Sequence, residues 1–443
     1  MKVAFYTLGC KVNQYETQAM RALFEAAGHT AVPFDARADA YVVNTCTVTQ
    51  TSDHKSRAML ARAHRLNPDA PVVAVGCYAQ LAPEAVAALA GVSLVIGTDG
   101  RRDVVRLVEE AAAAGRAAPR STVRPYGAAC AFESLSAVAD GRTRATLKIQ
   151  DGCRNFCAYC AIPFARGPLR SRPLADIRRE LERLAREGYR EVVLTGIHLA
   201  SWGVDSGEGD LCDVLRAAAA SGVDRIRLGS LEPGFCGERF AETAAALPQV
   251  CPQFHLSLQS GSDAVLRRMR RRYDTAGYAR AAALLRQARP GCALTTDVIA
   301  GFVGETEAEH AETLAFVARM AFARIHVFPY SRRRGTAADA MEGHLPRAVR
   351  EARAAELIAL GDRLEADYAR SLTGREAAVL VEAGSEGYTE TYVRTRVLAP
   401  CEEGALVRVR ITGAPRASGP SAPVMRTRTS APSSHGASTR VRT

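Results

Sequence analysis

Apolar runs that alternate with helical patterns restrict the fold of this chain more than any other feature of its sequence. Near the N-terminus, two stretches with helical spacing, Tyr15–Ala27 and Ser52–Arg65, separate three strand-like runs: Lys2–Thr7, Ala40–Val43 and Val72–Val75. Strands that alternate with helices form parallel sheets, because each helix carries the chain back to the edge where the previous strand began. We therefore predict an α/β domain with a parallel sheet over residues 1–112.

A cysteine closes each of these three apolar runs: Cys10, Cys46 and Cys77. The carboxyl ends of parallel strands share one edge of the sheet, where ligands bind in open α/β folds. Three neighbouring strands span about 10 Å at a spacing of ~4.8 Å, a gap that bending loops can close. The sequence therefore predicts that these cysteines meet. The alternative is three ordinary buried cysteines, since a free cysteine packs as a small hydrophobic side chain.

The same alternation resumes between about residues 143 and 330, after an Ala-, Gly- and Pro-rich stretch that we interpret as a linker over 113–140. Six runs have strand character: Thr146–Gln150, Glu191–Thr195, Arg225–Gly229, Phe254–Leu258, Leu294–Ala300 and Arg324–Phe328. A closed (β/α) barrel needs eight strands. Six predict an open, partial (β/α)6 barrel, in a domain over 141–371 that ends with a long helix at Pro346–Leu372.

The remaining residues have a different pattern. In LVRVRI (406–411), Val407, Val409 and Ile411 alternate with arginines, which is typical of a half-buried strand. We predict a small β-barrel over 372–413. From residue 414 the chain is rich in Ser, Pro, Arg and Gly and has no acidic residue, so we predict a disordered basic tail over 414–443.

A second group of cysteines directly follows the first predicted barrel strand. The sequence DGCRNFCAYCAIPFARG (151–167) contains Cys153, Cys157 and Cys160 with the spacing C-x3-C-x2-C. Four thiolates usually hold an iron–sulfur cluster, so three in one loop would leave one iron open to an outside ligand. The alternative, a structural zinc site, needs a fourth protein ligand. Residues 161–173 contain no Cys, His, Asp or Glu.

Charge and cysteine content narrow the possible environments and partners. The 443-residue chain has a formal charge of +11 and 12 cysteines. A positive charge favours an anionic partner, most commonly nucleic acid, although genomic base composition is an alternative source of part of the arginine excess. Without a recognisable secretion signal, the cysteines indicate a reducing, cytoplasmic compartment. No apolar run approaches the ~20 residues of a membrane span, so we expect no membrane partner.

The C-x3-C-x2-C loop after the first strand of a partial barrel resembles the radical S-adenosylmethionine enzymes. This resemblance implies a [4Fe–4S] cluster whose open iron binds S-adenosylmethionine, which then releases a 5′-deoxyadenosyl radical on reduction. The segments LGSLEP (228–233), LSLQSG (256–261) and DVIAGFVGE (297–305) follow predicted strands. By resemblance, the cofactor-binding residues in them are Glu232, Ser257, Gln259 and Gly301.

Taken together, residues 1–413 resemble the methylthiotransferases. The resemblance implies that Cys10, Cys46 and Cys77 hold a second [4Fe–4S] cluster that delivers sulfur. One S-adenosylmethionine would supply a methyl group and another the radical, and an electron donor such as a flavodoxin or ferredoxin would reduce the cluster. The C-terminal β region resembles the TRAM module, an OB-like RNA-binding barrel.

Three segments, TLGCKVNQYET (7–17), LTGIHLASWG (194–203) and PYSRRRGT (329–336), resemble the branch that acts on threonylcarbamoyl-adenosine in tRNA. Its target is carbon 2 of the adenine at position 37, beside the anticodon. Related branches act on isopentenyl-adenosine or on an aspartate of a ribosomal protein, and both remain alternatives. A non-catalytic metal-binding RNA module is a third. Arg334 departs from the branch pattern, in which proline is expected.

Several polar and aromatic residues have both a functional and a structural interpretation. Arg166, Arg170 and Arg172 follow the cysteine loop, and RRMRRRY (267–273) is a second basic run. They could contact cofactor or RNA, or form solvated faces. Lone histidines such as His198 and His255 are more often satisfied core residues. In the C-terminal β region, six residues could either contact RNA or form a solvated strand face: Tyr388, Tyr392, Arg394, Arg396, Arg408 and Arg410.

Overall fold

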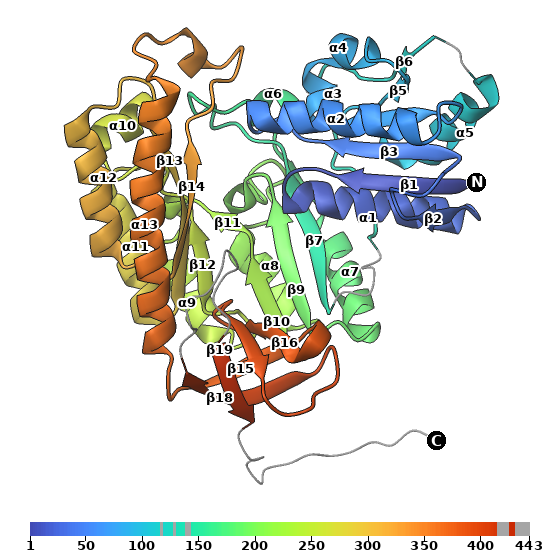
Figure 1. Ribbon diagram of the computed structural model, residues 1–443. Helices are drawn as coiled ribbons and strands as arrows, with labels where there is room; N and C mark the ends of the chain where they lie inside the picture. Colours follow the sequence, from blue (N-terminus) through green and yellow to red (C-terminus); the bar gives the residue numbers. More distant parts are fainter. Residues whose placement is uncertain (116–117, 127–129, 138–142, 414–424, 430–443) are drawn as a thin grey trace, which may run out of the picture.

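The computed structural model describes residues 1–115, 118–126, 130–137, 143–413 and 425–429. Its N-terminal unit is a sheet of six parallel strands in the order β2-β1-β3-β4-β5-β6, covered by helices on both faces (Figure 1). The elements are β1 Lys2–Thr7, α1 Lys11–Ala26, β2 Thr30–Val32, β3 Ala40–Thr45, α2 Gln50–Leu66, β4 Val72–Gly76, α3 Cys77–Leu81, α4 Pro83–Ala87, β5 Val92–Val95, α5 Val104–Ala114 and β6 Arg120–Ser121.

The central strands are apolar throughout because both faces of this sheet are buried. On β3, Tyr41 and Val43 pack into one hydrophobic cluster, whereas Ala40 and Val42 pack into the cluster on the opposite face. Strands covered on both faces are typically continuous apolar runs. The predicted α/β N-terminal unit is confirmed, and the carboxyl ends of β1, β3 and β4 lie side by side.

The segment predicted as a linker over 113–140 does not simply connect two units. Among its described residues, Arg120–Ser121 adds β6 to the edge of the sheet. Leu135 and Ala137 are buried in the core of the next unit. The Glu133 carboxylate accepts a 2.8 Å hydrogen bond from Nε of Arg101. Isolated apolar residues without a period carry little sequence signal, which explains why this packing was not predicted.

The central unit is a partial barrel, as predicted, whose strands are parallel except for the two-residue β8, which pairs antiparallel with β7. Two four-stranded sheets, β10-β9-β7-β8 and β11-β12-β13-β14, are joined by a bridge between Ile226 and Val250. In the described residues β14 pairs only with β13, and β7 only with β8 and β9, so the barrel stays open between β7 and β14. The strands are β7 Arg144–Asp151, β8 Arg170–Ser171, β9 Glu191–Gly196, β10 Arg225–Leu228, β11 Ser230–Leu231, β12 Gln253–Leu256, β13 Ala293–Ala300 and β14 Arg324–Pro329.

Helices cover the outer side of this barrel. Along each strand, apolar side chains that pack against the helices alternate with polar side chains that face the inside of the barrel. Leu256 and Leu258 pack into the core beneath the helices, whereas His255 and Ser257 are only partly buried. Successive side chains of a strand point to opposite faces, so polar residues line the barrel interior. The helices are α6 Ile162–Arg166, α7 Leu174–Arg186, α8 Leu211–Ala219, α9 Glu238–Ala246, α10 Asp263–Arg268, α11 Thr275–Ala288 and α12 Glu307–Met320.

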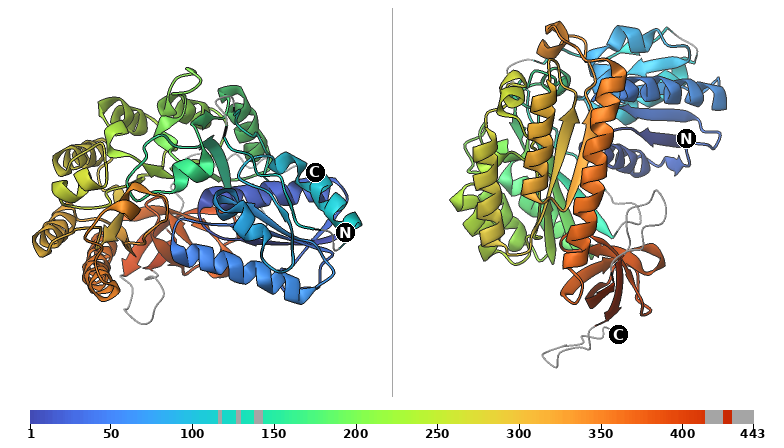
Figure 2. Two further views of the ribbon diagram at one scale, coloured as in Figure 1. Left: turned by 90° about the horizontal axis from the view of Figure 1, so that it is seen from above. Right: turned by 60° about the vertical axis from the view of Figure 1, so that its left-hand side comes forward.

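A long helix, α13 (Arg347–Ser371), runs along β14 and leads to a small C-terminal barrel (Figure 2). This barrel is closed, in the order β15-β16-β17-β19-β18. Five strands in a closed barrel agree with the predicted OB-like architecture. The strands are β15 Glu376–Val381, β16 Glu386–Thr389, β17 Arg394–Val397, β18 Leu406–Gly413 and β19 Met425–Thr429.

Strand β19 corrects the prediction that disorder begins at residue 414. Met425–Thr429 pairs with both β17 and β18 and closes the barrel. Met425 and Thr427 are buried there, because the open edges of β17 and β18 need a partner strand. The rest of the predicted tail, 414–424 and 430–443, lies outside the described residues.

In the part of the chain that the structure describes, no helix combines the length and apolar character needed to cross a bilayer.

Candidate functional site

The first group of cysteines lies along the carboxyl edge of the N-terminal sheet. Cys10 precedes α1, Cys46 follows β3, and Cys77 begins α3 directly after β4. Gly9 has a φ of +98°, and a Cβ atom there would lie 2.7 Å from Sγ of Cys46. Glycine is therefore required beside this thiol, both for its backbone conformation and for the close approach.

The three thiols are close enough to influence one another. Burial raises the pKa of Cys46 and of Cys77, and the neighbouring cysteines contribute to both shifts; against the opposing charge of Arg166, the pKa of Cys77 rises to about 12. Both thiols are thus protonated near neutral pH in the metal-free chain. Metal ligation by cysteine requires the thiolate, so iron would have to displace these protons.

The second group of cysteines occupies the loop between β7 and α6. The Cys160 amide donates a 2.9 Å hydrogen bond to the Cys157 carbonyl, and the Cys153 amide donates a 3.1 Å bond to the Gly167 carbonyl. The Ala158 amide also donates to the Met269 carbonyl at 2.9 Å, which ties the loop to the end of α10. Backbone bonds on both sides therefore hold this loop in one shape.

The donor chemistry of both groups fits iron–sulfur clusters better than a single metal ion. Within the described residues, no three His, Cys, Asp or Glu side chains are grouped as one ion would require. This disagrees with a preformed zinc site at either group. In an iron–sulfur cluster each thiolate binds a different iron, so the sulfurs need not converge on one point.

Arg271 connects the second cysteine group to Glu232. Its Nη1 donates a 3.1 Å hydrogen bond to Sγ of Cys157, and its Nη2 lies 3.0 Å from a Glu232 carboxylate oxygen. His198 Nε2 lies 2.8 Å from the same carboxylate, and Asn155 donates to it at 3.2 Å. Burial alone would raise the pKa of Glu232, but His198 and Arg271 outweigh burial and lower it. Glu232 is therefore an anion beside the cysteine loop.

Of the other three predicted cofactor residues, Ser257 is linked to Arg271 through Tyr273, whereas Gln259 and Gly301 are held by backbone bonds and close packing. The Ser257 carbonyl accepts a hydrogen bond from the Tyr273 hydroxyl, which itself accepts a 2.9 Å bond from Arg271. Gln259 stands at the end of β12 with a φ of +70°, bonded through its backbone to β13. A Cβ atom on Gly301 would lie 3.0 Å from the Arg350 Cα atom, so close packing against α13 accounts for this glycine.

Arg166 joins the two cysteine groups across the boundary between the N-terminal unit and the barrel. It lies six residues after Cys160, is fully buried, and donates from Nε to Sγ of Cys77 at 3.2 Å. Its Nη atoms bind the Glu16 carboxylate at 2.5 and 3.0 Å and the Asn13 amide oxygen at 2.6 Å. Cys77, at the start of α3, and the helix that follows the second cysteine loop therefore meet where α3 and α6 lie together (Figure 1).

A second arginine holds the loop that follows Cys46. Arg333, from the segment after β14, pairs with the Asp53 carboxylate at 2.7 Å and donates a 2.5 Å hydrogen bond to the Thr47 hydroxyl. Neither Arg333 nor Arg271 was singled out individually from the sequence. In the sequence both arginines lie within basic runs, and such runs usually mark a solvated surface and not a buried contact.

The buried charges around Arg166 predict a specific response to acid. Burial alone would raise the pKa of Glu16, but Arg101, Arg166 and Lys148 outweigh burial and lower it from 4.5 to about 2. A depressed carboxyl pKa stabilises the fold above the unfolded value, and this stabilisation is lost as pH falls towards the folded value. The thermal midpoint should therefore fall between pH 4.5 and 2, less steeply in Glu16→Gln. Equal slopes in calorimetric scans would contradict this.

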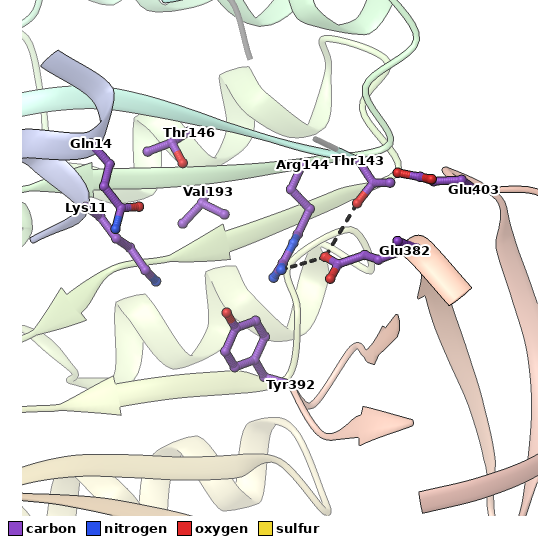
Figure 3. A pocket seen from close by; sticks show the side chains of 10 residues that line it. Lys11, Gln14, Thr143, Arg144, Thr146, Val193, Glu382, Tyr392 and Glu403 are labelled. Atoms are coloured by element: carbon purple, nitrogen blue, oxygen red, sulfur yellow. Dashed lines mark hydrogen bonds and ion pairs between the residues drawn. The ribbon is translucent and has the colours of Figure 1, made fainter. Parts of the chain in front are cut away.

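A cavity of about 400 Å³ opens on the inner side of the barrel, between the start of α1, strands β7 and β9, and the C-terminal barrel (Figure 3). The polar side chains in its walls include Lys11, Gln14, Thr143, Arg144, Thr146 and Glu382. Figure 3 shows Lys11, Arg144 and Tyr392 pointing into a common space. Desolvation by the surrounding walls and the charges of Arg227 and Arg144 lower the pKa of Lys11, against the opposing effects of Tyr392 and Glu191, although the side chain keeps access to solvent.

Tyr388 and Tyr392 fasten the C-terminal barrel beneath the central barrel. Their rings stack with centroids 4.7 Å apart. The guanidinium of Arg144 lies 4.9 and 5.3 Å from the two ring centroids, and that of Arg227 lies 4.6 Å from the Tyr392 centroid. Both rings are thus engaged in packing between units. Arg394 and Arg396 pair with Glu386, and Arg410 lies 3.6 Å from Glu376; the Arg408 and Arg410 side chains are exposed.

Comparison with known proteins agrees with this arrangement of units. The model of the uncharacterized protein family UPF0004 matches residues 2–97, and that of the radical SAM superfamily matches residues 147–317. The threonylcarbamoyladenosine tRNA methylthiotransferase MtaB of Bacillus subtilis is 40% identical over 426 residues, covering 93% of this chain and 94% of that protein. The chain belongs to the radical S-adenosylmethionine methylthiotransferase family.

Other relatives show how far this likeness extends. A tRNA-2-methylthio-N(6)-dimethylallyladenosine synthase of Mycobacterium bovis is 36% identical and covers 93% of this methylthiotransferase and 81% of that protein. The solved radical S-adenosylmethionine methyltransferase TsrM of Kitasatospora setae shares the fold, with a TM-score of 0.55 at 17% identity over 74% of this chain and 76% of that one. The superfamily match indicates a [4Fe–4S] cluster and S-adenosylmethionine as cofactors.

Proposed function

We propose that this methylthiotransferase adds a methylthio group to carbon 2 of N6-threonylcarbamoyladenosine at position 37 of tRNA, in the anticodon loop. The 40% identity to MtaB of Bacillus subtilis over nearly the whole of both chains supports this substrate. The polar barrel cavity also suits a threonylcarbamoyl group, which has a carboxylate, a hydroxyl and a ureido group. The positive charge of the chain suits an RNA partner in the cytoplasm.

The contact between Arg166 and Cys77 is the observation that carries the proposal. It brings α6, the helix that follows the second cysteine loop, against Cys77 of the first group, which supports a shared site. We propose that Cys153, Cys157 and Cys160 hold one [4Fe–4S] cluster and that Cys10, Cys46 and Cys77 hold another. When bound, these clusters and S-adenosylmethionine would supply the radical and the sulfur. The chain supplies their proximity, since both must reach one carbon atom.

Nearby side chains have roles that follow from their charge. Arg271 places a cation beside the Cys157 sulfur, where it would offset the negative charge of a thiolate-bound cluster. Glu232 is an anion beside the same loop and suits the ammonium group of S-adenosylmethionine. Ser257 and Gln259, at the end of β12, complete the proposed cofactor site together with the backbone at Gly301.

The proposed electron donor, a flavodoxin or ferredoxin, needs access to the cysteine loop. Phe156 and Phe164 are the exposed aromatic residues there, 49% and 51% accessible, with ring centroids 5.6 Å apart. Exposed apolar pairs are common at docking surfaces. This pair therefore marks the side from which a donor would approach the loop.

A second candidate substrate is N6-dimethylallyladenosine in tRNA, because relatives named for that product are 36% identical over 93% of this chain. That group is apolar and would leave Lys11, Gln14 and Thr146 of the cavity wall without a ligand partner. A site with polar groups that the ligand leaves unpaired disfavours that ligand, so the cavity favours the threonylcarbamoyl group.

Nucleoside mass spectrometry of bulk tRNA tests the proposed substrate. A strain without this gene should lose 2-methylthio-N6-threonylcarbamoyladenosine and accumulate the unthiolated nucleoside, whereas 2-methylthio-dimethylallyladenosine should be unchanged. Complementation with the wild-type gene, but not with Cys157→Ala, should restore the product. Persistence of the methylthio-threonylcarbamoyl nucleoside in the deletion strain would overturn the assignment.

A further inference from the structure

Lys11 places a cation in the barrel cavity at the first position after Cys10. It is the first residue of α1, and its side chain extends into the space between β7, β9 and the C-terminal barrel (Figure 3). Gln14, one helical turn further along α1, lines the same cavity. The residue beside a proposed cluster ligand therefore reaches the interior where substrate would lie.

The other cations around this cavity already have anionic partners. Arg144 pairs with Glu382 at 2.7 Å and lies 3.8 Å from Glu191. Arg225 and Arg227 pair with the same Glu191 carboxylate at 3.0 and 2.8 Å.

The Lys11 ammonium differs from these arginines. Among the described residues it makes no hydrogen bond and no ion pair, although it stands among polar side chains. The cavity wall also contains the acidic side chain of Glu382, which Figure 3 shows beside Arg144. Its carboxylate already accepts hydrogen bonds from Arg144 and Thr143. The Lys11 side chain is exposed to the cavity space and forms an ion pair with none of the described anions, so it is available to an anionic ligand that enters the cavity.

We propose that Lys11 binds the carboxylate of the threonylcarbamoyl group of the substrate adenosine and so selects this substrate over adenosines with apolar N6 groups. The inference deepens the proposed function and rests on it. Gln14 and Thr146 line the same wall and offer an amide and a hydroxyl to the ureido and hydroxyl groups of the ligand.

The position of Lys11 in the chain suits this role. In adenine, carbon 2 and the carbon that bears N6 belong to the same six-membered ring. A substrate whose carbon 2 faces the cysteine groups must therefore place its N6 substituent within a side-chain length of them. Lys11 follows Cys10 directly and meets this requirement. A site built to bind a polar group rejects analogues that lack it, because its own polar groups are left unpaired.

Binding of anticodon stem-loop RNA to the cluster-loaded full-length protein tests the proposal. Fluorescence anisotropy would compare RNA carrying N6-threonylcarbamoyladenosine with an analogue in which the carboxylate is a carboxamide. Wild type should bind the carboxylate RNA roughly tenfold or more tightly, since a charge-assisted hydrogen bond is at stake. Lys11→Gln should bind both RNAs with the affinity that wild type shows for the carboxamide, whereas Lys11→Arg should keep the preference.

Controls separate this proposal from its alternatives. Lys2→Gln, at the opposite edge of the sheet, should behave as wild type. Iron content should match wild type in Lys11→Gln, which would confirm that both clusters load. Equal weakening of both RNAs in Lys11→Gln would indicate a phosphate contact, and an unchanged preference would indicate no contact; either result overturns the proposal. Failure of wild type to methylthiolate the carboxylate RNA would instead refute the proposed function.

Discussion

Cys157→Ala is expected to abolish 5′-deoxyadenosine formation, to less than about a hundredth of the wild-type rate, when S-adenosylmethionine and dithionite are supplied. Cys157 is the middle cysteine of its loop, and its sulfur accepts the hydrogen bond from Arg271. Loss of one of only three thiolates leaves the proposed cluster with two protein ligands. No described Cys, His, Asp or Glu completes a metal-binding group there. Chromatography of the quenched reaction measures the product.

Cys46→Ala should give the opposite pattern. Cys46 belongs to the other proposed cluster and is buried beside Gly9 at the end of β3. We expect it to leave 5′-deoxyadenosine formation within about twofold of wild type and to remove methylthio product from the tRNA. Cys401→Ala, in the C-terminal barrel and outside both groups, is the matched control and should keep both activities.

Iron content after anaerobic reconstitution tests whether the two groups of cysteines hold two separate clusters. Wild type and Cys401→Ala should bind about eight iron atoms per chain, and each cluster variant about four, as two independent [4Fe–4S] clusters require. If Cys46→Ala and Cys157→Ala lose the same activities, or if wild type binds only about four, the two clusters do not have separate roles.

The placement of both cysteine groups follows from local pattern and strand topology, which is why it could be predicted. Cys10, Cys46 and Cys77 each follow an apolar run, and parallel strands bring their carboxyl ends together whatever the loops contain. Cys153, Cys157 and Cys160 lie within one loop, so their proximity is fixed by the sequence spacing itself. The partial barrel followed in the same way from the count of alternating runs.

Partners of charged side chains could not be predicted, because they come from distant parts of the chain. Arg166 binds Glu16, 150 residues away, and Arg333 binds Asp53, 280 residues away. Nothing in the sequence around an arginine distinguishes a buried partner from solvent. For the same reason the sequence does not single out Lys11, whose place in the cavity beside the paired Arg144 is a property of the fold. Strand β19 was missed because MRTRT has no apolar alternation typical of a strand.

These distant pairings have a common purpose, which is to fix one unit against the other. A sheet edge that carries one group of cysteines and a barrel mouth that carries another give no joint chemistry unless their relative position is held within about an ångström. Hydrophobic contacts alone tolerate sliding, whereas a buried guanidinium with fixed hydrogen-bond geometry does not. Arg166 and Arg333 therefore set the register of the two units.

Arg166→Ala is accordingly expected to lower the free energy of unfolding by about 3–5 kcal/mol, the cost of removing one partner from a buried ion pair. The substitution leaves the Asn13 amide oxygen without its 2.6 Å donor and removes two hydrogen bonds from Glu16. Both side chains are buried, so water does not replace these bonds without opening the interface. Arg166→Lys keeps the charge but not the fork of donors, and should fall between wild type and alanine.

Urea unfolding of the cluster-free protein measures this loss, followed by the fluorescence of Trp202, the only tryptophan, which is buried in the barrel core. The matched control is Arg347→Ala, which removes an exposed pair with Glu351 and should cost less than about 1 kcal/mol. Because Arg166 and Glu16 act as a pair, the double variant Arg166→Ala/Glu16→Gln should lose less than the sum of the single losses, by about 1–3 kcal/mol. Strict additivity, or a loss in Arg166→Ala no larger than in Arg347→Ala, would mean that the two units are held by their apolar contacts and that Arg166 does not set their register.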